Sequence, residues 1–202
     1  MKQIFTIATL LLALSLTAQD GKEKKAIQIF SSEKAINANT PEIVGKGKMA
    51  FKVSHNFGDI AGKAGGVKNF FGLDNSTDVR IAFQIGIGKR LDAIVGRTKG
   101  AGQQQRAVEL GLKFKLLEQL ENDQSHPVSV ALYANMAIAT NDANVFPNQD
   151  NSYGGFSDRV SNIFQLIIAR KMGKVSLQLN PTLLTRGYAI SYDQKSMFAL
   201  GG

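Results

Sequence analysis

The most regular part of the sequence lies between Thr77 and Thr98, where apolar and polar side chains alternate on both sides of a short turn. Before the turn, apolar residues occupy every second position: Val79, Ile81, Phe83, Ile85 and Ile87. After Lys89 and Arg90 the alternation resumes, and Ile94 interrupts it. A period of two residues is typical of a β-strand with one apolar and one polar face. The pattern therefore predicts a β-hairpin, and its first strand matches the roughly 9 to 11 residues that cross a bilayer when tilted.

The same alternation recurs along most of the chain. It predicts strands at residues 48–57, 106–116, 128–140, 160–171 and 174–184, and the opening of another at residues 197–202. A weaker pattern at residues 26–36 suggests a first strand. Helix is expected to be scarce, and residues 109–121 are the most helix-favouring segment because they are rich in Leu, Lys and Glu.

The connections differ strongly in length. Residues 58–76 and 141–158 form long polar or glycine-rich loops, whereas residues 89–90 and 172–173 form very short turns. Transmembrane barrels have this asymmetry, with long loops on one side and short turns on the other. A first strand at residues 26–36 would place the N-terminus on the long-loop side, so either that strand is misassigned or the 58–76 connection is periplasmic. This connection, which contains Phe70 and Phe71, could fold over the mouth of a barrel.

The N-terminus has the layout of a secretory signal peptide. Lys2 precedes an apolar stretch at residues 4–16, and Thr17 and Ala18 provide small residues for cleavage after Ala18. The expected organisation is a signal peptide at residues 1–18 and one β-barrel domain at residues 19–202. The chain has no cysteine, which excludes a disulfide framework and a thiolate metal site.

The chain carries 24 Lys and Arg residues against 16 Asp and Glu residues, a formal charge of +8. These basic residues are scattered singly along the predicted strands and do not cluster with aromatic residues. Nucleic acid is therefore not expected as a partner.

Three stretches carry a resemblance to a known family: KVSHNFGD at residues 52–59, NFFGLDNSTDVRIAF at residues 69–83 and ELGLKFKLLEQ at residues 109–119. They resemble an uncharacterised Bacteroidetes family of exported outer-membrane β-barrel proteins, a domain of unknown function, and the likeness spans residues 27–200. The resemblance implies an outer-membrane barrel and supplies no catalytic residues. Members of that family continue with further strands beyond the Phe-Ala-Leu-Gly-Gly position, so the resemblance implies a barrel truncated at its C-terminus.

The expected fold is therefore all-β, an incomplete antiparallel up-and-down β-barrel of the outer-membrane type. Such barrels close with an even number of strands, so this chain is expected to be a fragment or to need a second copy. The expected partners are membrane lipid and the outer-membrane assembly machinery. The leading function is a passive channel or structural element for an unknown solute. The alternative is a soluble periplasmic barrel that binds an apolar ligand, with the same apolar faces pointing inward.

The polar faces of the strands provide the candidate lumen-facing residues. These are Lys52, Arg80, Asp92, Glu109, Lys113 and Lys115. On all such faces together, seven basic residues oppose three acidic ones, a surplus of four that predicts anion preference in an open pore. On the same reasoning, an arginine at Gln84 is expected to be tolerated in a water-filled lumen.

No constellation predicts catalysis, a cofactor or a metal. His55 and His126 are the only histidines, and neither has Glu or Cys at metal-ligand spacing. Asp123, Ser125 and His126 superficially suggest a hydrolase, but neighbours on one loop do not readily adopt triad geometry. The chain is therefore not expected to be an enzyme.

Overall fold

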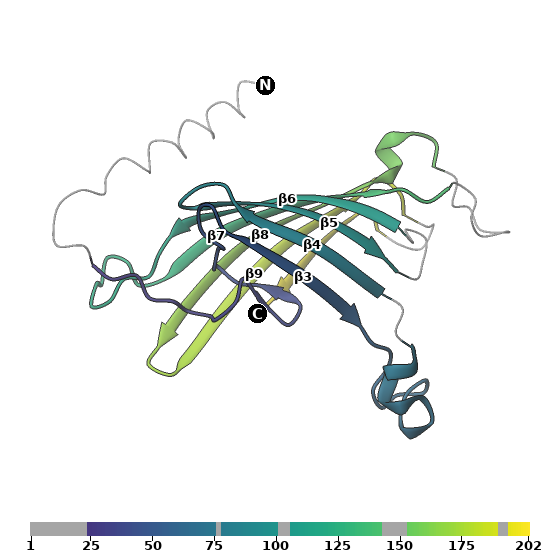
Figure 1. Cartoon of the computed structure of the whole chain (residues 1–202), viewed down its shortest axis with the longest axis horizontal. Helices are drawn as coiled ribbons and strands as arrows, with labels where there is room; N and C mark the ends of the chain where they lie inside the picture. The colour runs from purple at the N-terminus through teal and green to yellow at the C-terminus, as the bar shows by residue number, and fades with distance from the viewer. Residues whose placement is uncertain (1–23, 76–77, 101–105, 143–152, 190–193) are drawn as a thin grey trace.

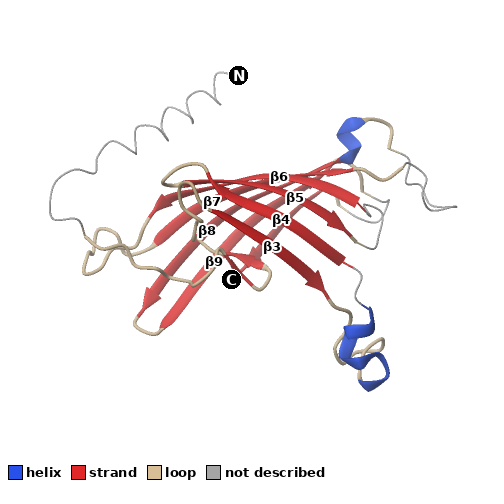
Figure 2. Cartoon of the chain, in the orientation of Figure 1, coloured by secondary structure: helices blue, strands red, loops and turns tan. Residues whose placement is uncertain are grey.

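The computed structural model describes residues 24–75, 78–100, 106–142, 153–189 and 194–202. The predicted signal peptide and its cleavage site lie outside these residues. The described chain is dominated by one antiparallel sheet (Figures 1 and 2). Its eight strands are β3 (Met49–Asn56), β4 (Asp78–Gly86), β5 (Leu91–Lys99), β6 (Arg106–Leu117), β7 (Ser129–Ala139), β8 (Val160–Met172), β9 (Val175–Arg186) and β10 (Ser196–Gly201). Each strand pairs with its neighbour in the chain, which confirms the predicted all-β, up-and-down order.

The prediction of a first strand at residues 26–36 is wrong. These residues contribute one isolated bridge, from Ala26 to Leu120, and the strand β1 (Lys34–Ala35), which pairs only with β2 (Ala38–Asn39). Ile36 adopts a left-handed φ of 50° at the turn between β1 and β2. The chain therefore reverses direction inside the segment expected to be extended. Because residues 26–36 do not form a strand of the sheet, the first strand is β3 and the chain enters the sheet from the short-turn end. The N-terminus therefore no longer has to lie on the side of the long loops.

The sheet arches over the residues that precede it, and the β1–β2 hairpin lies beneath the arch (Figure 1). We call residues 24–48 the N-terminal segment, the sheet face that contacts them the inner face, and the opposite face the outer face. Gly86 permits the closest approach of the two, because a Cβ there would collide with the Gly45 carbonyl. Two backbone hydrogen bonds stabilise this contact, Gly47 N to Gly86 O at 2.8 Å and Gly86 N to Lys48 O at 2.9 Å.

Polar residues dominate the inner face, with a small apolar cluster among them. Ile94, which interrupts the sequence alternation, keeps the strand's phase and is buried on the inner face beside Ala131, Tyr133 and Ile167. The apparent break is therefore an apolar residue on a mostly polar face.

The outer face is apolar and exposed. Phe51 and Leu177 are each 57% exposed and come from β3 and β9, far apart in the sheet, and Phe164 of β8 is 53% exposed. The large apolar side chains thus lie on the outside of the arch, where no other part of the described chain covers them.

The long loops carry the only helical turns among the described residues, η1 (Val67–Asn75) and η2 (Phe156–Arg159). Figure 2 shows η1 extending beyond the end of β3, away from the arch. In this arrangement the loop with Phe70 and Phe71 does not fold over the inner face. No helix of the described residues is long and apolar enough to cross a membrane.

The sheet is open. Within the described residues β3 and β10 form its two edges and do not pair with each other.

Candidate functional site

All six residues predicted to face a lumen lie on the inner face. Each of them contacts the N-terminal segment or another residue of this set. The candidate site is therefore this face together with the segment that covers it.

Lys113 is almost fully enclosed, with only 1% of its surface exposed. Its Nζ donates hydrogen bonds to the carbonyl oxygens of Glu33 at 2.8 Å, Thr40 at 3.0 Å and Glu42 at 3.0 Å. An ammonium has three N–H donors, and here all three are used. A single side chain of β6 thus fixes the backbone of the N-terminal segment at three points.

Asp92 is fully buried directly opposite Lys113 in the β5–β6 register. Its Oδ2 accepts hydrogen bonds from the Val44 backbone N–H at 2.8 Å and from Gln84 Nε2 at 2.6 Å. Gln84 Oε1 in turn accepts from Lys52 Nζ at 3.1 Å. Gln84 is 5% exposed and bonded on both ends, so it does not line the water-filled lumen on which the expectation of a tolerated arginine was based.

Ion pairs involve the remaining charged residues. Lys52 pairs with Glu33 at 2.9 Å and Lys115 with Glu42 at 3.5 Å, and both acidic partners belong to the N-terminal segment. Arg80 pairs with Glu109 at 2.7 Å within the sheet. The count of charges made from the sequence omitted Glu33 and Glu42. These two carboxylates pair with Lys52 and Lys115, so the positive surplus on the inner face is smaller than that count predicted.

Further contacts extend across the sheet to β8 and β9. Asn180 Nδ2 donates to the Asn39 carbonyl at 3.0 Å, and Asn39 Nδ2 donates to Gln165 Oε1 at 3.0 Å. Ser176 Oγ donates to the Ile29 carbonyl at 2.8 Å. The N-terminal segment is thus bound from β3 to β9 and occupies the inner face along this width.

Sequence reasoning missed the acidic residues Glu33 and Glu42 as partners of the inner face, because it assigned the surrounding residues to a strand and a loop. Two signals pointed to them. The alternation at residues 26–36 is poor, and these two carboxylates precede a set of strands whose polar faces are mainly basic. Charge complementarity between the segment and those faces could have revealed the contact.

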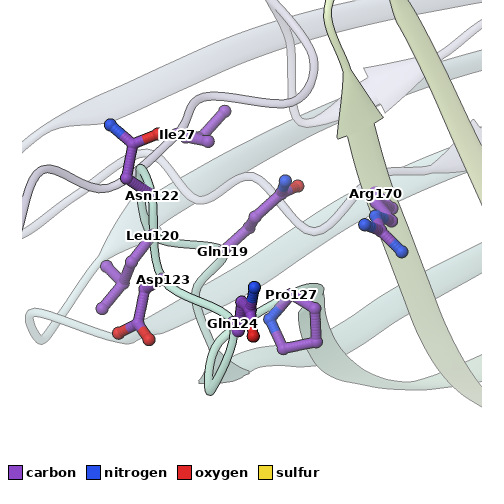
Figure 3. A pocket seen from close by; sticks show the side chains of 8 residues that line it. All are labelled: Ile27, Gln119, Leu120, Asn122, Asp123, Gln124, Pro127 and Arg170. Atoms are coloured by element: carbon purple, nitrogen blue, oxygen red, sulfur yellow. The ribbon is translucent and has the colours of Figure 1, made fainter.

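A hollow of about 630 Å³ lies at the short-turn end between the start of the N-terminal segment and the β6–β7 loop (Figure 3). Asp123 lies on its wall and accepts hydrogen bonds from the Ser125 backbone N–H at 2.9 Å and His126 Nδ1 at 3.0 Å. Lys24 lies 3.1 Å from the same carboxylate. Ser125 contacts Asp123 through its backbone, as in a capped turn and unlike a nucleophile relay.

Neither histidine lies in a group of residues that could ligate a metal within the described part of the chain. Among the described residues, no group of three or more His, Cys, Asp or Glu side chains is arranged to hold a metal ion. His55 stacks on Phe57 with ring centroids 5.2 Å apart near the end of β3.

Comparison with known proteins gives one match. A family model described as "Membrane bound beta barrel domain (DUF5777)" matches residues 30–202, which include all eight strands and most of the N-terminal segment. No curated protein and no solved structure matches the chain significantly. With an apolar exposed outer face, a polar covered inner face and a family match over most of its length, the chain belongs to this family of membrane-bound β-barrel domains.

Proposed function

We propose that this chain is an outer-membrane β-barrel protein whose lumen is closed by its own N-terminal segment. The observation that carries the proposal is the anchoring of residues 24–48 by Lys113, Asp92, Lys52 and Lys115 of the inner face. Because the N-terminal segment is held on the inner face by these buried polar contacts, it favours a structural or gated role over an open passive channel.

The dimensions of the strands support a membrane location. Strands β4 to β9 are 9 to 13 residues long, and a tilted strand needs about 9 to 11 to cross a bilayer. Contiguous exposed apolar surface of this kind marks a membrane or protein contact. The soluble alternative required the apolar faces to point inward, and their exposed position speaks against it.

Export and the orientation of the barrel in the membrane are further parts of the proposal. Lys2 and the apolar residues 4–16 support secretion, and the short-turn end, where the N-terminal segment enters, would face the periplasm. Expression in a Gram-negative host should place the mature protein in the outer-membrane fraction with an N-terminus near Gln19. Recovery from the soluble fraction without detergent would refute the membrane location.

Measurements of ion conductance test the proposal that the N-terminal segment closes the lumen. Purified full-length protein in planar bilayers should show negligible steady current, whereas the double variant Asp92→Asn, Lys113→Gln should show frequent openings. The absence of native cysteine allows an internal control, the pair Asn39→Cys and Gln165→Cys added to that double variant. A reducible bis-maleimide cross-linker that joins the two thiols should close this protein, and a reductant should reopen it. Steady current from the wild type, or openings that ignore the redox state, would contradict the closed-lumen proposal.

A further inference from the structure

We propose that the cavity between the β1–β2 hairpin and the inner face binds a small molecule bearing an oxyanion, a phosphate or a carboxylate, through Lys34 and Arg80. The cavity measures about 290 Å³. It is a binding site in addition to the closed lumen and does not depend on transport.

The walls of this cavity carry more positive than negative charge. Lys34, Lys52 and Arg80 line it, against the single carboxylate of Glu109. Lys52 is already engaged, since its Nζ contacts Glu33 Oε2 at 2.9 Å and Gln84 Oε1 at 3.1 Å. The Lys34 side chain has no hydrogen-bond or ion-pair partner among the described residues.

Glu109 does not supply the missing partner. Its Oε2 accepts hydrogen bonds from Arg80 Nε at 2.8 Å and Asn135 Nδ2 at 3.2 Å, and its Oε1 accepts one from Thr98 Oγ1. Arg80 uses Nε and Nη2 on this carboxylate, and its Nη1 has no partner within the described chain. One ammonium and one guanidinium nitrogen therefore remain as charged donors on the cavity wall.

The position of Lys34 is electrostatically unfavourable when the cavity holds no anion. Burial lowers its pKa, the nearby charges of Arg80 and Lys52 lower it further, and the charge of Glu109 opposes this shift without cancelling it. An anion between Lys34 and Arg80 would offset this repulsion, and the Arg fork suits the planar geometry of a carboxylate or the oxygens of a phosphate.

The remaining walls indicate a small organic ligand. Asn37 offers a neutral hydrogen-bonding group, and Ile94 and Ile163 offer apolar contacts. Gln165 and Thr182 also line the cavity and are hydrogen-bonded to each other. At about 30 Å³ for each water in the liquid, the cavity has room for roughly ten water-sized groups. Arg80 lies near the β4 end that joins the long loop, so the ligand would arrive from that side, beyond the contacts made by Lys113.

Titration calorimetry on the full-length protein in detergent tests this site, with inorganic phosphate and succinate as probes at constant ionic strength. The wild type should bind at least one of the two saturably, and Lys34→Gln should weaken that binding about tenfold or more. Lys46→Gln is the matched control, because Lys46 is an exposed residue of the same segment that does not line the cavity. It should bind as the wild type does.

Lys34→Arg restores a charged donor and should recover most of the affinity. Without ligand, Lys34→Gln should melt at or above the wild-type temperature, because the substitution removes the repulsion from Arg80 and Lys52 and breaks no hydrogen bond of the Lys34 side chain. A loss of binding in this variant would therefore not be due to misfolding. Preference for phosphate or for succinate identifies the anion class. The site is refuted if neither probe binds the wild type, if Lys34→Gln binds normally, or if Lys46→Gln loses as much affinity. None of these measurements depends on conductance, so this proposal and the closed-lumen proposal can fail separately.

Discussion

Two lysines near the inner face occupy contrasting environments. Lys113 is buried with three backbone carbonyls as acceptors, whereas Lys34 is partly buried beside two other cations. The first has a carbonyl acceptor for each of its N–H groups, which offsets part of the cost of burying it. The second lacks such acceptors, and this difference separates an anchoring residue from a candidate ligand contact.

Replacing Lys113 with methionine should lower the free energy of unfolding by roughly 3 kcal/mol, since carbonyls left unpaired in a buried place cost about 1 to 3 kcal/mol each. Urea unfolding in detergent measures the loss. Lys46→Met changes the same charge at an exposed position and should stay within about 0.5 kcal/mol of the wild type. Equal effects of the two substitutions would show that Lys113 does not anchor the segment.

On the outer face, the loss of stability caused by a charged substitution should depend on how deep the residue lies in the bilayer. Phe83→Arg should cost about 2 to 4 kcal/mol if this exposed residue lies near the middle of the bilayer. Ile87→Arg, at the short-turn end of the same β-hairpin, should cost about 0 to 1 kcal/mol, because the penalty falls near the interface. Unfolding in lipid vesicles compares the two, and a similar cost at both positions would contradict the lipid-facing assignment.

Asp123 provides a local pH dependence outside the strands. The Ser125 backbone N–H and then Lys24 hold the pKa of this carboxyl at about 2, below its ordinary value of 3.8. A depressed folded-state pKa contributes stability above the unfolded-state pKa and loses it as the pH falls toward the folded value. The Ser125 amide resonance should therefore titrate with a midpoint near 2 and not near 4. Asp123→Asn should abolish this titration, and a midpoint near 4 in the wild type would show that the turn is not held by the carboxylate.

At the scale of elements, the N-terminal segment behaves as part of the sheet although it contributes no strand to it. Between its two ends its backbone groups bond to side chains of β5, β6 and β9. Backbone-to-backbone hydrogen bonds to the rest of the chain occur near the ends, as between Ile27 and Gln119 and between Gly47 and Gly86. The order of its middle part therefore depends on these buried polar side chains, and removing one of them should release the nearby backbone without disturbing the sheet.

Hydrogen exchange can detect this release. In Asp92→Ala the Val44 amide loses its acceptor, so amides near residues 40–44 should exchange faster while those of β5 to β8 keep their protection. Asp59→Ala is a useful comparison, because this exposed residue caps only its own loop through the Ala61 and Gly62 amides. Unchanged exchange near Val44 in Asp92→Ala would mean that other contacts hold the segment.

At the scale of the whole molecule, the open edges β3 and β10 raise the question of closure. Unpaired backbone groups are not tolerated in lipid, so both edges must find partners in a membrane. An eight-stranded barrel has an interior just wide enough for its own side chains, whereas this inner face also accommodates the N-terminal segment and a cavity of about 290 Å³. Direct pairing of β3 with β10 is therefore unfavourable.

We expect the 202-residue chain in detergent to associate with a second copy and not to form a monomeric heat-modifiable barrel. Light scattering coupled to size exclusion gives the mass, and gel mobility with and without heating reports the barrel. A heat-modifiable monomer would mean that β3 and β10 pair with each other despite the enclosed segment.

The sequence by itself determined the strands, their order and the two faces, because a period of two residues is a local property that reads directly from adjacent positions. It also placed Lys52, Arg80, Asp92, Glu109, Lys113 and Lys115 on one face. What covers that face was decided only by the tertiary structure, since Glu33 and Glu42 reach Lys52, Lys113 and Lys115 from far along the chain. Such contacts depend on charge and hydrogen-bond complementarity across an arch, and no local pattern in residues 24–48 encodes them.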